Sequence, residues 1–188
     1  RAALPIMMTG VGESVTAIEV DRIQDASIRR LPFQQKIGAG LEPSAFMRKV
    51  EDGSVRHVGL EESIRMIAEA MGWRLDKITD EVRPKVATEH VRSAFFEIAP
   101  GGVCGLIQDG IGYRKGTPLV RLHMEAYIGA PASYDAIRIS GTPPLALKVE
   151  SGVHGDVATA SIVVNSIPRI LTAPPGIRTM RDMVLPGF

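Results

Sequence analysis

Residues 151–176 read SGVHGDVATASIVVNSIPRILTAPPG, and the rest of the chain is organised around this stretch. A glycine-flanked polar turn comes first, and apolar residues at steps of three and four then predict a helix of about four turns. We expect Asp156 to cap this helix, since its carboxylate can accept hydrogen bonds from the free amides of the first turn. Pro168 lacks an amide hydrogen and is expected to kink or end the helix near Asn165.

The predicted helix is apolar on nearly every side. A helix of this kind is normally buried all round. We therefore expect it to pack on a sheet on one side and on another domain or subunit on the other. The apolar residues that lead to this prediction are Val157, Ala160, Ile162, Val163, Val164, Ile167, Ile170 and Leu171.

The clearest strand is predicted by a two-residue alternation in residues 118–128. Its apolar side chains face one way and its charged and polar side chains face the other, so one face of the sheet is expected to be buried. The polar row has two interpretations, contact with water and contact with a partner subunit. Shorter alternating runs, separated by glycine and proline turns, predict strands at residues 78–86, 103–113, 137–139 and 145–149.

The N-terminal part of the chain predicts helices and one further strand. Helices are expected at residues 4–8, 43–50 and 60–71 and a strand at residues 15–27, whereas residues 28–41 show no clear period. An isoleucine out of phase with its neighbours suggests a bulge near Asp21 and Arg22. This order of elements predicts the α+β class, with a largely antiparallel or mixed sheet of about five or six strands and helices on one face.

The composition excludes several classes of protein. The chain has 188 residues, 45% of them apolar, which suits a globular core. A net charge of +1 gives no general reason to bind nucleic acid or a membrane surface. The longest apolar runs are far shorter than the ~20 residues of a membrane span. Cys104 is the only cysteine, so no internal disulfide can form and a cytoplasmic location is expected.

Most familiar catalytic and cofactor motifs do not occur in the sequence. Gly38 and Gly40 look like the start of a dinucleotide-binding G-x-G-x-x-G, but Pro43 takes the place of the third glycine and no strand precedes them. There is no P-loop, no H-E-x-x-H or C-x-x-C metal motif and no G-x-S-x-G, and the four histidines are scattered. We therefore expect no metal, and no cofactor bound by this chain alone.

Three positions carry groups that are suited to chemistry. Lys36 stands at the lip of a loop of small residues, where it could donate a proton or anchor a carboxylate; the alternative is a surface lysine beside a flexible turn. His57 precedes a predicted helix and could relay a proton, or it could simply cap that helix. His154 lies next to a glycine at a helix start, which fits a ligand site and a domain interface equally well.

Seven segments, spread over nearly the whole chain, carry a resemblance to a known family. They are DASIRRLPFQQKIGAG at 25–40, HVGLEES at 57–63, TDEV at 79–82, GTPPL at 141–145, GVHGDVATA at 152–160, NSIPR at 165–169 and APPG at 173–176. With these segments the chain resembles the C-terminal domain of the 2,4-diaminopentanoate dehydrogenase family. That family is related to 4-hydroxy-tetrahydrodipicolinate reductase and to diaminopimelate dehydrogenase.

The resemblance implies a second domain and a candidate site. Members of the family begin with a Rossmann domain that binds NAD or NADP, which would be missing here, in agreement with a start at Arg1 that lacks an initiator methionine and reads as the middle of a helix. In the reductase relatives a loop lysine donates a proton and the next residues hold a carboxylate. Lys36, with Gly38, Ala39 and Gly40, resembles that loop. Its Asp, Pro, Ser and Thr are not matched, so the substrate must differ.

The sequence thus predicts the substrate-binding and oligomerisation domain, residues 1–188, of an NAD(P)-dependent oxidoreductase acting on a C–N bond of a small amino acid or imine. Lys36 and His57 are the predicted catalytic residues, and Gly38, Ala39, Gly40 and His154 the predicted substrate-binding residues. Residues 152–156 would line the cleft between domains, where Asn165 and Arg169 would meet the missing domain. Relatives form dimers or tetramers through the open face of the sheet, so a homodimer or homotetramer is expected. The alternative is a non-catalytic dimerisation or small-ligand-binding domain, and the isolated chain is expected to be inactive.

Overall fold

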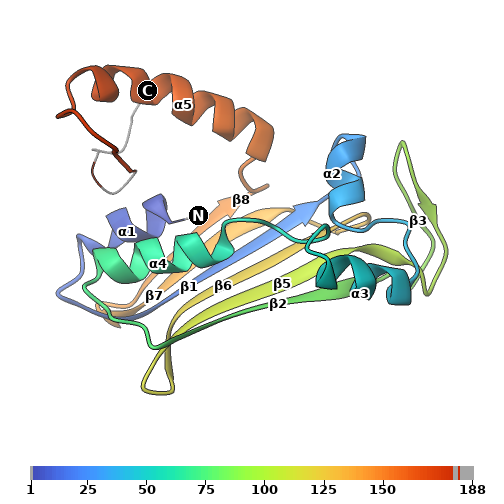
Figure 1. Cartoon of the computed structure of the whole chain (residues 1–188), viewed down its shortest axis with the longest axis horizontal. Coiled ribbons are helices and arrows are strands. Elements are labelled where there is room, and N and C mark those ends of the chain that lie inside the picture. Colours follow the sequence, from blue (N-terminus) through green and yellow to red (C-terminus); the bar gives the residue numbers. More distant parts are fainter. Residues whose placement is uncertain (1, 180–181, 183–188) are drawn as a thin grey trace.

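The computed structural model describes residues 2–179 and 182, and in this part of the chain six strands form one sheet with helices on a single face (Figure 1). The predicted α+β class is confirmed, and the sheet is of the mixed kind. Its strands, in spatial order, are β2 (Lys77–Val86), β5 (Val103–Arg114), β6 (Thr117–Tyr127), β1 (Ser14–Asp25), β7 (Tyr134–Thr142) and β8 (Leu145–Glu150). A two-stranded hairpin, β3 (Val91–Arg92) and β4 (Glu97–Ile98), lies in the connection between β2 and β5.

The sheet is mixed because β1 runs parallel to β6, while the other neighbouring strands are antiparallel. A parallel pair needs a long crossover, and here the crossover holds three helices and four strands, namely β2 and β5 of the sheet and the β3–β4 hairpin. The carboxyl ends of β1 and β6 therefore meet at the same edge, where the Ala26 amide donates to the Tyr127 carbonyl oxygen at 2.9 Å. The chain leaves β1 at this edge and enters α2 (Leu31–Lys36).

The helix α4 (Leu60–Ala70) lies close against β5 because glycines take the place of side chains under it. An added Cβ at Gly110 would lie 2.7 Å from Cδ2 of Leu60 and 2.9 Å from Cδ1 of Ile64. Together with α1 (Ala3–Thr9), α4 buries one apolar cluster. Its fully or nearly fully buried members are Ala2, Ile18, Val20, Leu60, Ile64, Ile67, Val120, Leu122, Ile137 and Ile139.

A second apolar cluster lies between the sheet and the loops that carry α2 and α3 (Pro43–Glu51). Phe46 of α3 is completely buried in it, and the strand residues Leu106 and Met124 belong to the same cluster. The predicted helices at the N-terminus, after Pro43 and at Leu60 are all present, although Arg1 lies outside the described residues. The helix α2 was not predicted, since it is only six residues long and begins with a proline at its first turn.

The predicted bulge near Asp21 and Arg22 is wrong. The register of β1 against β7 shifts between Val15 and Ala17 instead. The apolar alternation is interrupted in the sequence because Arg22 and Gln24 face the helix side of the sheet, where they line a cavity, and Ile23 faces the open side. Arg22 and Gln24 are thus polar, at positions where apolar side chains are expected, because they line a cavity and not because the strand backbone bulges.

The helix α5 (Gly155–Leu171) differs from the prediction at both ends. Its N-cap residue is His154, and no side chain caps it; Asp156 lies in the first turn and pairs with arginines instead. Pro168 lies inside the helix and does not end it. The helix surface around Val164 is exposed, so water can reach the carbonyl that the proline leaves without an amide partner.

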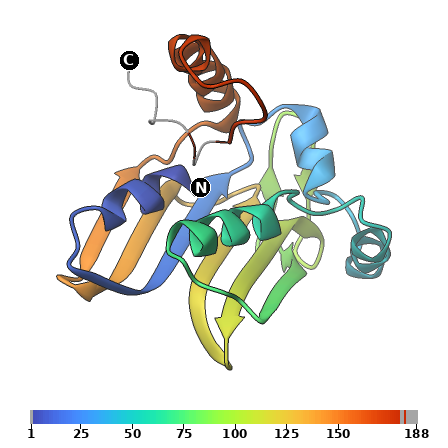
Figure 2. The same cartoon turned by 60° about the vertical axis from the view of Figure 1, so that its left-hand side comes forward.

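The helix α5 stands apart from the sheet, above α1 and α4 (Figures 1 and 2). The prediction that one side of it packs on this sheet is therefore wrong, because Ser166 is the one residue of the helix that is buried in the described part of the chain. Packing on another domain or subunit stays a prediction. The large apolar side chains that α5 exposes are Val157, Ile162, Val163, Val164, Ile167, Ile170 and Leu171.

The open face of the sheet carries the polar row that the sequence indicates, and its charges pair with one another. His123 lies between two carboxylates, with Nδ1 2.8 Å from Oδ1 of Asp109 and Nε2 3.2 Å from Oε1 of Glu125. Burial acts to raise the pKa of Asp109, but hydrogen bonds from His123 and Arg83 outweigh it and hold that pKa below its ordinary value. Glu125 follows the same pattern: burial acts to raise its pKa, but the favourable interactions, of which the hydrogen bond from Lys85 is the largest, together outweigh burial and the pKa lies below its ordinary value.

The close packing of α4 on β5 predicts a large cost for removing Ile64, which is fully buried. Ile64→Ala should lower the free energy of unfolding by about 2–5 kcal/mol, because a cavity remains above the glycines of β5. Urea unfolding measures the change. Glu62→Ala, on the exposed side of the same helix, is the matched control and should cost less than about 1 kcal/mol. Equal losses for the two variants would show that α4 does not pack as described.

Candidate functional site

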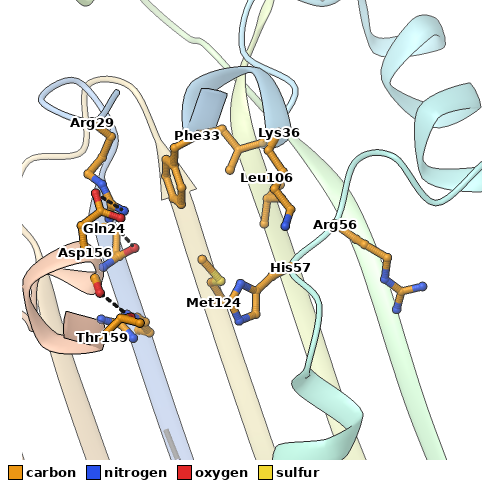
Figure 3. A pocket seen from close by; sticks show the side chains of 13 residues that line it. Gln24, Arg29, Phe33, Lys36, Arg56, His57, Leu106, Met124, Asp156 and Thr159 are labelled. Carbon is orange, nitrogen blue, oxygen red and sulfur yellow. Dashed lines mark hydrogen bonds and ion pairs between the residues drawn. The ribbon is translucent and has the colours of Figure 1, made fainter. Parts of the chain in front are cut away.

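A cavity of about 310 Å³ opens at the edge where β1 and β6 end (Figure 3). Its floor is apolar, formed by Leu106 of β5 and Met124 of β6. Its walls come from α2, from the loop that precedes α4, and from the first turn of α5. Three segments that are far apart in the sequence therefore meet around one small space. Such a volume suits a small molecule rather than a dinucleotide.

One side of the cavity holds both predicted catalytic side chains. Lys36 reaches in from the last turn of α2, and His57 reaches in from the loop before α4 (Figure 3). The sequence separates them by one helix, α3, and the loops on either side of it, and the fold brings them to the same wall. An amine and an imidazole above an apolar floor can exchange protons with a bound ligand. Their catalytic roles stay predictions.

The buried side chain of Gln108 fixes the loop that carries His57. Its Oε1 accepts from the His57 amide at 2.7 Å, and its Nε2 donates to the His57 carbonyl oxygen at 3.1 Å. The same Nε2 donates to Oδ1 of Asp80 at 2.7 Å, and Asp80 forms an ion pair with Arg56. Gln108 was missed in the sequence, although a polar residue in phase with Leu106 on a buried strand is a usable signal.

The other side of the cavity is charged. Arg29 lies over the ring of Phe33, 4.2 Å from its centroid, and its Nη2 is 3.4 Å from Oδ2 of Asp156 in the first turn of α5. A second buried glutamine holds the loop that carries Arg29. Nε2 of Gln34 donates to the Ala26 carbonyl oxygen at 2.8 Å and to the Arg29 carbonyl oxygen at 2.7 Å. Neither Arg29 nor Gln34 was singled out in the sequence.

The predicted substrate-binding residues do not line this cavity. Gly38 lies against the ring of Phe46 and Gly40 against the ring of Phe96, where added Cβ atoms would come within 2.5 Å and 2.8 Å of ring carbons. Ala39 between them is buried. The small residues at this loop thus leave room for the protein's own aromatic rings. The last residue of the predicted set, His154, is exposed at the start of α5, next to two residues that do line the cavity, Gly155 and Asp156.

Other chemistries find little support within residues 2–179 and 182. No group of three or more His, Cys, Asp or Glu side chains in this part is placed to hold a metal ion. Cys104 is buried on β5, and burial raises the pKa of its thiol, which is unfavourable for a nucleophile. No described helix has the length and apolar character that crossing a membrane requires.

Comparison with known proteins identifies the family. The profile of the 2,4-diaminopentanoate dehydrogenase C-terminal domain matches residues 2–187. The chain belongs to this family. The resemblance found in the sequence motifs is thereby confirmed.

Two proteins of known name are similar to this chain, one in sequence and one in fold. The 2,4-diaminopentanoate dehydrogenase of Acetoanaerobium sticklandii is 32% identical over 189 residues, which cover 97% of this chain and 54% of the relative. The solved structure of an amine dehydrogenase from Mycobacterium smegmatis has a TM-score of 0.84 at 20% identity, over 98% of this chain and 56% of that chain. The second likeness shows the same fold. The chain spans about half the length of each relative.

The hydrogen bonds of Gln108 predict a measurable effect of its loss. Gln108→Leu should lower the free energy of unfolding by about 1–3 kcal/mol, because the amide of His57 and the carboxylate of Asp80 lose their buried partner. Amide exchange in residues 55–59 should become faster as the loop loosens. Gln35→Leu, at an exposed position of α2, is the matched control and should change neither quantity appreciably. Unchanged stability and unchanged exchange in Gln108→Leu would contradict the role given to this side chain.

Proposed function

We propose that this chain is the substrate-binding and oligomerisation part of an NAD(P)-dependent oxidoreductase that acts on a C–N bond of a small amino acid or imine. The observation that carries the proposal is the cavity of a dehydrogenase-family domain in which Lys36 and His57 share a wall above an apolar floor. The substrate we propose to test first is 2,4-diaminopentanoate, which the name of the A. sticklandii relative contains.

The chain's own residues do not fit a dinucleotide. Gly38 and Gly40 come nearest to a phosphate-binding loop, but they follow a helix rather than a strand. The rings of Phe46 and Phe96 occupy the space beside these two glycines. We therefore place NAD or NADP on a Rossmann domain that precedes this chain. The nicotinamide of that cofactor would accept or supply the hydride. The part of this chain would be to hold the substrate and to handle the proton.

Proton transfer falls to Lys36 first and to His57 second. The Lys36 amine extends into the cavity from a short helix whose next residue, Ile37, is buried, so the base of the side chain is fixed while its end is free to reach a ligand. The backbone of His57 is held on both sides by Gln108. Groups that are held in place before the ligand arrives lose little entropy on binding, which favours catalysis.

Two surfaces support a larger assembly. The exposed apolar side chains of α5 form a patch of a kind that a monomer rarely leaves uncovered, and we place the preceding domain there, in contact with Asn165 and Arg169. The open face of the sheet, with its charges already paired, is placed against a second copy to give a homodimer or homotetramer. We place the assembly in the cytoplasm.

The direct test replaces the predicted proton donor. In the full-length protein, Lys36→Met should lower kcat/KM for 2,4-diaminopentanoate about 10²- to 10⁴-fold, because a positioned acid or base contributes on that order. The assay follows NADH or NADPH formation. Lys49→Met, at an exposed position of α3, is the matched control and should leave turnover unchanged. Unchanged turnover in Lys36→Met would show that Lys36 takes no part in the reaction. Absence of turnover in the unsubstituted full-length protein would favour the non-catalytic alternative.

A further inference from the structure

Arg29 is a buried guanidinium whose hydrogen bonds are incomplete. Its side chain is 7% exposed, and within the described residues its Nε is buried without a hydrogen-bond partner. Its two other nitrogens make only long contacts, Nη2 to Asp156 at 3.4 Å and Nη1 to Gln24 at 3.5 Å. Hydrogen bonds between an arginine and a carboxylate are normally near 2.7–2.9 Å. The guanidinium therefore has donor capacity that the protein itself does not use well.

The surroundings of Arg29 hold the guanidinium rigidly beside the cavity. Phe33 lies under it at 4.2 Å, and Gln34 holds its backbone carbonyl at 2.7 Å. The residue of α5 that lies next to its nitrogens is Gly155, where an added Cβ would be in ordinary van der Waals contact with Nη2, at 3.7 Å. The open space next to the donors is the cavity itself, which Arg29 lines. A rigid arginine with open space beside it is suited to bidentate binding of a carboxylate.

Asp156 now occupies this position only loosely. It is 43% exposed, and it is shared between Arg29 and Arg30, with both nitrogen–oxygen distances at 3.4 Å. The segment before it is held separately, because the Val153 amide donates to Asp135 at 2.8 Å and the Val153 carbonyl accepts from Arg22. Release of Asp156 from Arg29 would therefore not detach α5 from the domain.

We propose that Arg29 binds a carboxylate of the ligand and that Asp156 is the internal carboxylate that it replaces. This inference rests on the function proposed for the cavity and adds the substrate feature that the cavity recognises. Arg29 and Asp156 lie on the wall opposite Lys36 and His57 (Figure 3). A small amino acid whose carboxylate binds Arg29 thus extends its remaining atoms across the apolar floor towards Lys36. Lys36 is then left for the proton rather than for the carboxylate.

The exchange also couples the ligand to α5. Asp156 belongs to the first turn of the helix, so a ligand carboxylate on Arg29 removes one of the contacts that hold this turn. The same competition lowers the apparent affinity of the free protein, because the ligand must first displace Asp156. Removing the charge of Asp156 is therefore expected to strengthen carboxylate binding. Substitution of a residue that itself binds the ligand would instead weaken binding.

The test measures binding of propionate and of propionamide, its uncharged isostere, to the 188-residue chain by NMR titration. Asp156→Asn should bind propionate at least about threefold more tightly than the unchanged chain, with no change for propionamide. Arg29→Lys should bind propionate at least about tenfold more weakly. Glu62→Gln, which removes an exposed negative charge on α4, is the control for net charge and should have no effect.

Amide exchange gives a second measurement that does not depend on the arginine variant folding. Propionate should speed exchange in residues 155–159 of the unchanged chain and should have no such effect in Asp156→Asn. Unaltered or weaker propionate binding in Asp156→Asn overturns the proposal. Failure of 2,4-diaminopentanoate to bind, with the propionate results as expected, would instead overturn the proposed substrate and leave the carboxylate site in place.

Discussion

Hydrogen bonding of backbone groups that water cannot reach is the constraint on which the cavity depends. The loop after β1 and the loop before α4 pass over the sheet without regular structure, and unpaired buried amides and carbonyls there would be costly. Two buried glutamines remove that cost, Gln34 in the first loop and Gln108 in the second. Each glutamine therefore sets the position of one side of the cavity, Arg29 through Gln34 and His57 through Gln108.

The strand order explains why these loops meet. Because β1 and β6 are parallel neighbours, both end at the same edge, and the chain that leaves β1 turns back over the sheet as α2. The first turn of α5 reaches the same edge from the other end of the chain. Polar groups gather there because the side chains of β1 that face the helices are apolar as far as Val20, and the next two on that side are Arg22 and Gln24. A site for a small polar ligand and the end of the apolar core are thus the same feature.

Regular elements and the family could be predicted from the sequence, and most of the cavity could not. The alternation in residues 118–128 and the stripe that begins at Leu60 are long enough to be decisive, whereas α2 is too short to show a period. Gly38 and Gly40 were misleading because close packing on an aromatic ring requires glycine as much as close approach to a ligand does. The roles of Gln34, Gln108 and Arg29 depend on contacts between distant segments, which no local pattern contains.

The most direct measurement is a crystal structure of the full-length protein with 2,4-diaminopentanoate. We expect the ligand in the cavity between α2 and the first turn of α5, with its carboxylate on Arg29 and an amino group near Lys36. In that structure α5 should also be covered by the preceding domain. A ligand bound elsewhere, with water filling the cavity beside Lys36, would contradict the central claim that this edge of the sheet is the substrate site.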